Sequence, residues 1–188
     1  MFLRDGYKND SRIRYAIRID GNSITDKFYY NHIKLLIKNI LNKDIKIKYR
    51  NYGNNIFIMF HDKEFALFLH NKLNFPYGKK RNLKIPIELI NNKKSINSVL
   101  RGFFDTDGCI YFTKNNSKIR NYPIIELSTH DKTLLNQLKQ ILKNKGFNIK
   151  ISYFNDSIKL HGKNNILKWM KEISSNNIDK YSKFIFWQ

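Results

Sequence analysis

The sequence predicts an α+β fold built from two related, αββαββα-like repeats, each with a curved antiparallel sheet. The first observation is that alternating apolar–polar segments and segments of helical spacing follow the order strand, helix, hairpin, helix twice along the chain. The second is an internal offset: Asp5-Gly6 and Asp107-Gly108 lie 102 positions apart (107 − 5), and so do Ile47 and Ile149 (149 − 47). A matching offset at two separate landmarks favours a duplicated unit over two unrelated halves.

Composition places the boundaries of the repeats. The chain has 188 residues, enough for one domain or two small ones, and its 41% hydrophobic content supports a real core rather than disorder. Two prolines, a glycine and a cationic run mark residues 75–94 as a basic connector. We therefore expect a first repeat over 1–74 and a second over 95–188.

The first repeat begins with a strand pattern in which cationic residues alternate with apolar ones, from Arg12 to Asp20. Thr25 is expected to cap a helix, and a second basic strand follows over 45–50. A more fully buried strand over 56–60 and a helix over 63–73 complete the repeat. The apolar stripe of the first helix is expected to comprise Tyr29, Ile33, Leu36, Ile37 and Ile40.

The second repeat opens with a short helix capped by Ser95 that ends at an acidic turn and passes into a strand. Gly108 suits the left-handed position that ends a helix. Asp105 and Asp107 then lie at the helix C-terminus, where the macrodipole disfavours negative charge, and a bound cation would explain them. An ordinary polar turn is the alternative for the Asp-Thr-Asp-Gly segment taken alone.

The rest of the second repeat follows the order of the first. Tyr122–Ser128 is expected to be a strand, and Thr129 or Asp131 caps the next helix. Two short strands, over 149–153 and 158–161, precede a helix that starts at about Lys163. The apolar tail over 181–187 is expected to pack against the rest of the repeat.

Charge limits the partners. The 35 Lys and Arg residues exceed the 15 Asp and Glu by 20, which favours nucleic acid first and an anionic membrane second. A coding bias toward Lys, Asn and Ile is the alternative source of this charge. The single cysteine, Cys109, excludes an intrachain disulfide and a cysteine-based zinc cluster. No apolar run has the length of a membrane span, so a cytoplasmic, nucleoid-associated protein is expected.

The cations lie on predicted strands rather than along one amphipathic helix, which favours DNA over a membrane surface. A strand ribbon fits the major groove, where alternating side chains reach base edges and phosphates; a solvated sheet face is the alternative. Two acidic helix ends between such sheets suit Mg²⁺ and metal-assisted phosphodiester hydrolysis. The expected DNA-binding residues are Arg12, Arg14, Arg18, Lys46, Lys48, Arg50, Lys79, Lys80, Arg81, Lys150, Ser152 and Lys159.

The segment Leu100–Gly108 resembles the motif of the LAGLIDADG homing endonucleases, with Leu, Gly, both Asp and the last Gly in place. The connector, with Gly78-Lys79-Lys80 followed by Ile85-Pro86, is similar to that of archaeal, intein- or intron-type members with two repeats in one chain. The resemblance implies a monomeric pseudo-dimer. Its two motif helices pack through small residues, and its sheets form a saddle over double-stranded DNA.

The resemblance also implies roles for particular residues. Asp107, Asp5 and Gly108 are expected at the metal site, which takes Mg²⁺ and can also hold Mn²⁺ or Ca²⁺. Gly102 is the expected helix-contact residue, and Asp105 is expected to support the helix end. His130 and Lys163 are candidates for catalytic residues that assist the water network, with an ordinary loop histidine as the alternative for His130.

One departure concerns the first motif. Only four residues precede Asp5, too few for a helix, so a preceding segment or partner is expected to supply it, or the motif has decayed. Without that helix, the apolar side of the helix over 95–107 would favour self-association. The alternative is a non-catalytic nucleic-acid binder on the same scaffold, either an RNA maturase or a transcription-factor-like module. RNA is then an alternative partner. A general cationic chromatin or RNA-coating protein is the third possibility.

Overall fold

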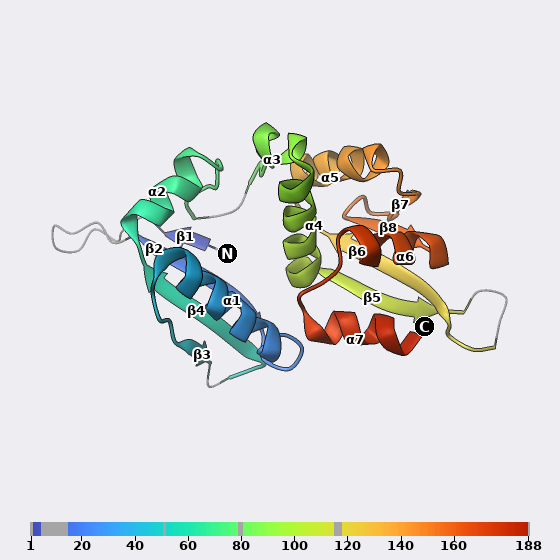
Figure 1. Ribbon diagram of the computed structural model, residues 1–188, viewed down its shortest axis with the longest axis horizontal. Helices are drawn as coiled ribbons and strands as arrows, with labels where there is room; N and C mark the ends of the chain where they lie inside the picture. The colour runs from blue at the N-terminus through green and yellow to red at the C-terminus, as the bar shows by residue number, and fades with distance from the viewer. Residues whose placement is uncertain (1, 5–14, 51, 79–80, 115–117, 188) are drawn as a thin grey trace. The chain divides into compact units, whose positions relative to one another are not determined.

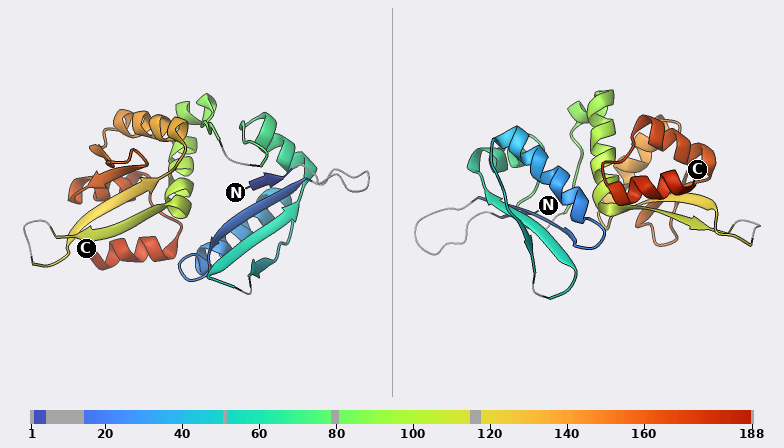
Figure 2. Two further views of the ribbon diagram at one scale, coloured as in Figure 1. Left: turned by 180° about the vertical axis from the view of Figure 1, so that it is seen from behind. Right: turned by 60° about the horizontal axis from the view of Figure 1, so that its bottom comes forward.

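The computed structural model describes residues 2–4, 15–50, 52–78, 81–114 and 118–187. The chain forms two compact units, Met1–Leu83 and Lys84–Gln188. Each unit has a four-stranded antiparallel sheet with helices packed on one of its faces (Figures 1 and 2). The predicted α+β class with two repeats is confirmed.

The first unit contains one sheet and two helices among its described residues. Its sheet has the strand order β1-β2-β4-β3. The elements are β1 (Phe2–Arg4), β2 (Ala16–Asn22), α1 (Lys27–Leu41), β3 (Ile47–Tyr49), β4 (Asn55–His61) and α2 (Lys63–Asn71). The predicted strand from Arg12 is described only from residue 15 onward, so Arg12 and Arg14, predicted to bind DNA, lie outside the described residues.

The second unit repeats this plan and adds helices at its ends. Its sheet has the order β5-β6-β8-β7, which is the order of the first sheet. The elements are α3 (Ile87–Asn91), α4 (Lys93–Asp107), β5 (Gly108–Thr113), β6 (Tyr122–Ser128), α5 (Lys132–Asn144), β7 (Ile149–Ile151), β8 (Ser157–His161), α6 (Lys163–Glu172) and α7 (Ile178–Trp187).

The register of the edge hairpins supports the duplication. Ile47 pairs with Ile58 in the first sheet, and Ile149 pairs with Leu160 in the second. Both pairs therefore keep the offset of 102 that the sequence shows (149 − 47 and 160 − 58). The two sheets can be compared position by position.

Each unit has its own apolar core between the sheet and the helices. The core of the first unit includes Ile17, Tyr30, Ile33, Ile37, Ile56 and Ile58. In the second unit the fully buried side chains include Leu127, Leu138, Leu142, Leu160, Ile166 and Trp169. Because helices cover one face of each sheet, alternate strand residues lie on the opposite, outer face.

Two expectations for helix α1 are wrong. Helix α1 begins at Lys27 with Asp26 at the N-cap position, rather than at a Thr25 cap. Its stripe is narrower than predicted, because Leu36 and Ile40 are 43% and 65% exposed. These two side chains lie at the border of the buried face of α1. Helical spacing in the sequence does not distinguish residues at this border from residues at the centre of the face.

The predicted Ser95 cap of helix α4 is wrong, because the helix begins at Lys93, three residues before the start that a Ser95 cap implies. Asn92 is its N-cap, and its side-chain oxygen accepts a hydrogen bond from the Ser95 amide at 3.0 Å. Strand β4 alternates rather than being fully buried, since Met59 is 37% exposed. The residues predicted as connector include helix α3 and fall on both sides of the boundary between the units. No helix in the described part of the chain is long and apolar enough to cross a membrane.

Candidate nucleic-acid interface and metal site

The two aspartates at the end of α4 have opposite environments. Asp105 is completely buried, whereas Asp107, the last residue of the helix, is exposed. The chain passes from Asp107 directly into β5, the first strand of the second sheet. Only Asp107 of this pair is therefore accessible to a ligand from solvent.

The Asp105 carboxylate is held by the segment that joins α6 to α7. The Ser175 hydroxyl donates to Oδ1 at 2.5 Å, and the Asn176 backbone amide donates to Oδ2 at 2.9 Å. The Asn177 side-chain amide donates to the Asp105 carbonyl at 3.2 Å. A buried carboxylate with such partners stabilises one arrangement of the helix end, which agrees with a supporting role for Asp105.

Lys180 supplies the positive charge at the C-terminus of α4. Its ammonium group donates to the carbonyls of Phe104 and Asp105 at 2.7 and 2.8 Å, and the residue is 8% exposed. A cation at this end of a helix interacts favourably with the macrodipole and with the last carbonyls. The sequence predicts a bound cation in this role, but the ammonium group of Lys180 from α7 performs part of it.

Gly108 is required for steric space rather than for a left-handed backbone. Its φ of −97° and ψ of 167° are extended, so the predicted left-handed helix end is wrong. A Cβ atom at this position would lie 2.6 Å from Phe104 Cδ2 and 2.8 Å from the Phe104 carbonyl oxygen. The helix therefore passes into the strand without a turn, and only glycine fits against Phe104.

Other polar residues fix α4 along one side. The Asn97 side-chain amide donates to the Glu172 carbonyl at 2.9 Å, and Arg101 Nε donates to the Ile173 carbonyl at 2.5 Å. Apart from its two chain neighbours and the backbone of its own helix, no described atom lies within 4 Å of a Cβ built on Gly102. The predicted helix contact at Gly102 stays a prediction.

Among the described residues, the Asp107 carboxylate has one hydrogen-bond donor, the Thr106 hydroxyl, 3.0 Å from Oδ2. The same hydroxyl lies 3.0 Å from the Gly102 carbonyl, so its single proton serves one acceptor at a time. Among the described residues, no group of three or more His, Cys, Asp or Glu side chains could hold a metal ion. Asp5, the predicted second ligand, lies outside the described residues.

The structure does not bring the predicted assisting residues into contact with Asp107. His130 is exposed in the loop between β6 and α5, and Lys163 is exposed as the first residue of α6. No hydrogen bond or ion pair within the described segments joins either residue to Asp107. Their catalytic roles stay predictions.

Two lysines predicted to bind DNA lie together on the outer face of the second sheet. Lys150 of β7 pairs directly with Lys159 of β8. Two cations in directly opposed positions repel each other, so this arrangement favours an anionic partner. Lys159 also lies 3.5 Å from Glu126 of β6, which the sequence argument did not single out.

Glu126 is the centre of a polar cluster on this face. Its carboxylate accepts hydrogen bonds from the Tyr111 hydroxyl at 2.9 Å and from the Ser157 hydroxyl at 2.5 Å. Burial and the bond to the Glu126 carboxylate raise the pKa of Tyr111, so its hydroxyl stays protonated at neutral pH. Nearby, burial together with Lys150 lowers the pKa of His161, which favours the neutral imidazole.

Ser152 belongs to the turn between β7 and β8. Its hydroxyl donates a hydrogen bond to Asp156 Oδ1 at 2.6 Å and accepts hydrogen bonds from the backbone amides of Asp156 and Ser157. At the tip of this turn, Tyr153 and Phe154 are 92% and 77% exposed. Ser152 therefore stabilises a turn that presents aromatic side chains to solvent.

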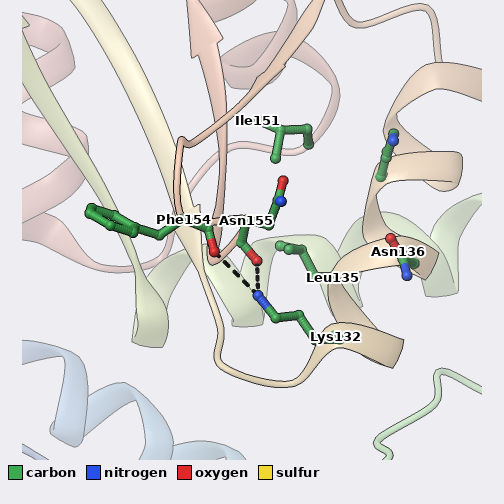
Figure 3. A pocket seen from close by; sticks show the side chains of 7 residues that line it. Lys132, Leu135, Asn136, Ile151, Phe154 and Asn155 are labelled. Carbon is green, nitrogen blue, oxygen red and sulfur yellow. Dashed lines mark hydrogen bonds between the residues drawn. The ribbon is translucent and has the colours of Figure 1, made fainter.

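A hollow of about 380 Å³ lies between this turn and α5. Figure 3 shows the Lys132 ammonium directed at the carbonyls of Phe154 and Asn155, to which it donates at 3.3 and 2.5 Å. This lysine fixes the turn to the helix. Leu135 and Ile151 form part of the lining.

Three of the predicted DNA-binding residues belong to the first sheet. Arg18 lies in β2, Lys48 lies in β3, and Arg50 directly follows β3. Arg18 forms a bidentate ion pair with Asp20, and Arg50 lies 3.9 Å from the same carboxylate. Lys48 is opposite Phe57 in the register and is exposed. Lys46 and Arg81 are also exposed, and Arg12, Arg14, Lys79 and Lys80 lie outside the described residues.

The residues that sequence reasoning missed are Asp20, Glu126 and Lys180. The prediction for the sheet faces named cationic residues and therefore did not include Asp20 and Glu126, although both lie on these strands. Lys180 lies far from the motif in sequence, and its position depends on how α7 packs. For the acids, the alternation pattern did contain a signal, since both fall on the outer side of a strand.

Comparisons with known proteins find a similar domain family for part of the chain and similar folds among solved structures. Residues 94–183 match the LAGLIDADG-like domain family. No curated protein sequence matches the chain. The solved structure of I-DmoI in complex with DNA and Ca is similar over 98% of this chain and 90% of that one, with 15% identity and a TM-score of 0.64.

Two further LAGLIDADG homing endonucleases bound to DNA targets are similar. I-GzeII has 14% identity and a TM-score of 0.60, with 99% of this chain and 83% of that chain covered. I-LtrWI has 14% identity and a TM-score of 0.58, with 98% and 82% covered. The chain therefore has the two-repeat fold of these proteins.

Proposed function

We propose that this chain, which has a LAGLIDADG-like domain and the fold of LAGLIDADG homing endonucleases, is a site-specific endonuclease that hydrolyses both strands of DNA with a divalent metal ion. The observation that supports this most directly is the contrast at the end of α4. Asp105 is buried and fully bonded, while Asp107 is exposed where the helix meets the sheet. An accessible carboxylate at a fixed helix end is suited to binding a metal ion, which a purely structural turn does not require.

The outer sheet faces support DNA as the substrate. Each sheet has cations on this face, including the opposed pair Lys150 and Lys159 in the second. Cationic side chains bind phosphates, and polar ones bind base edges in the major groove. The similar structures of I-DmoI, I-GzeII and I-LtrWI contain DNA.

The donor set fits Mg²⁺, Mn²⁺ or Ca²⁺. Mg²⁺ is usually held by one or two protein carboxylates together with substrate phosphates, so a single exposed carboxylate such as Asp107 is a suitable partial site. I-DmoI structures contain Ca, Mg and Mn. Asp107 and Asp5, with the backbone at Gly108, would hold the ion. When bound, such an ion activates water and stabilises negative charge on the leaving oxygen.

The residues of the chain contribute positioning. The Asp105 bonds and Lys180 fix the end of α4, so the Asp107 carboxylate is presented in one place. His130 and Lys163 are proposed to assist proton transfer from water. We further propose that the chain acts as a monomeric pseudo-dimer on DNA in the cytoplasm.

A cleavage selection tests the proposal. A random duplex library is incubated with the protein and Mg²⁺, and cut ends are captured and sequenced. The expected result is a defined sequence cut on both strands. A motif that is bound but never cut would instead favour the non-catalytic binder, and tighter binding of a structured intron RNA than of any duplex would favour the maturase.

A further inference from the structure

The guanidinium group of Arg18 is fixed on the outer face of the first sheet. Asp20, on the same strand and the same face, accepts from Nε at 2.9 Å and from Nη2 at 2.7 Å. The guanidinium carbon lies 4.3 Å from the centroid of the Phe57 ring, on the neighbouring strand. The Arg18 side chain is 18% exposed, so it is held from two sides and still reaches solvent.

These contacts leave one edge of the guanidinium available. A guanidinium has five N–H donors, and Asp20 takes the edge formed by Nε and Nη2. Within the described residues, Asp20 is the one hydrogen-bond acceptor of the Arg18 guanidinium. The opposite edge, formed by Nη1 and the second proton of Nη2, therefore has two parallel donors, which match the O6 and N7 acceptors of guanine in the major groove.

We propose that Arg18 reads a guanine in the part of the target that the first unit covers, and that Asp20 and Phe57 are the residues that position it. The proposal rests on the proposed function only in that it needs sequence-specific binding of duplex DNA. Cleavage is not needed for it.

Charge favours a base edge over a phosphate as the partner of Arg18. The Asp20 carboxylate, which also lies 3.9 Å from Arg50, offsets part of the Arg18 charge and so reduces the attraction of Arg18 for a phosphate. Recognition of guanine depends instead on two well-placed donors, which the pairing fixes in direction. Lys48, which is exposed and forms no ion pair with any described residue, is the better phosphate ligand on this face.

The second sheet lacks this device at the matching place. Ile19 pairs with Ile58 and Ile125 pairs with Leu160, so Asp20 and Glu126 occupy the same position in the two sheets. The residue two before the acid is Arg18 in the first sheet and Ile124 in the second. The two parts of the target should therefore differ at this position, with the guanine on one side only.

Binding selection from a random duplex library, without divalent metal so that no strand is cut, tests the proposal. The wild type should enrich a motif with one strongly preferred guanine. Arg18→Ala and Arg18→Lys should both lose that single preference, with a 10- to 100-fold weaker affinity for the preferred duplex, because lysine keeps the charge but not the fork. Lys48→Ala should instead weaken all sequences about equally and reduce the salt slope by about one.

Asp20→Asn gives a readout that a merely structural role would not move. With the carboxylate gone, Arg18 is less fixed and more attractive to phosphate. Preference for guanine should fall several-fold, while the salt dependence of binding becomes steeper. Circular dichroism of each variant confirms that the sheet is intact.

Three results would overturn the proposal. If Arg18→Lys keeps the wild-type motif, charge rather than the fork is what matters. If Arg18→Ala weakens every sequence equally, Arg18 is a phosphate contact. A motif that is enriched but not cut in Mg²⁺ would contradict the endonuclease function and leave the Arg18 assignment standing, whereas no enriched motif would refute both.

Discussion

Replacing Lys180 with methionine should destabilise the second unit by about 2–4 kcal/mol. The buried ammonium donates to the carbonyls of Phe104 and Asp105, and a hydrogen bond that involves a charged group contributes about 1.5–3 kcal/mol. The expected loss of stability is smaller than the sum of these two hydrogen-bond contributions, because each carbonyl keeps another donor when Lys180 is replaced. The Gly108 amide still bonds the first, and the Asn177 side chain still bonds the second.

Urea titration followed by tryptophan fluorescence measures this effect. Both tryptophans of the chain, Trp169 and Trp187, lie in the second unit, so the signal reports that unit. Lys183→Met is the matched control, because Lys183 lies on the same helix but forms only an exposed pair with Asp179. The control should lose no more than about 0.5 kcal/mol.

The comparison has a clear contrary result. If Lys180→Met unfolds within about 0.5 kcal/mol of the wild type, with an unchanged dependence on urea, the ammonium does not stabilise the end of α4. The macrodipole argument for the two aspartates would then be wrong. An equal loss in both variants would mean that any change of charge on α7 matters, not the bonds to the carbonyls.

Gly108→Ala should destabilise the second unit by about 1–3 kcal/mol, because the new methyl group overlaps Phe104. Gly102→Ala should instead stabilise it by up to about 1 kcal/mol, because alanine has the higher helix propensity. Equal effects of the two substitutions in the same urea assay would refute the steric explanation for Gly108. The first unit should lose stability in acid, because a hydrogen bond from Lys43 lowers the pKa of Asp62 in the folded state. The stability from Asp62 is complete above its unfolded pKa of about 3.9 and is lost as pH falls through the lower folded value. Tyrosine near-ultraviolet circular dichroism from pH 6 to pH 2 should show a smaller loss in Asp62→Asn, and an identical loss would contradict this.

Periodicity predicted much of the fold. The alternation in β6 predicted this strand, and the helical stripe of α5 predicted the buried face of this helix. Asp131, one of the two predicted caps, is the N-cap of α5. The offset of 102 also predicted that the two sheets repeat, and the register agrees. These features depend on residues that are neighbours in sequence.

The details at the site could not be predicted in the same way. The burial of Asp105 depends on Ser175 and Asn176, which lie 70 and 71 positions away. The sequence shows Asp105 and Asp107 as a similar pair, and the packing of the segment that joins α6 to α7 separates them. Likewise, Gly108 fits a left-handed helix end by residue type, whereas its real constraint is the position of Phe104.

The most direct test of the proposed function compares cleavage and binding in Asp107→Asn. The substitution keeps the shape of the side chain and removes the charge that would bind a metal ion. On the duplex recovered by the cleavage selection, we expect cleavage in Mg²⁺ to be abolished and metal-free binding to stay within a few fold of wild type. Cleavage that persists in this variant, or binding that falls as much as cleavage, would contradict the role of Asp107 as a metal ligand.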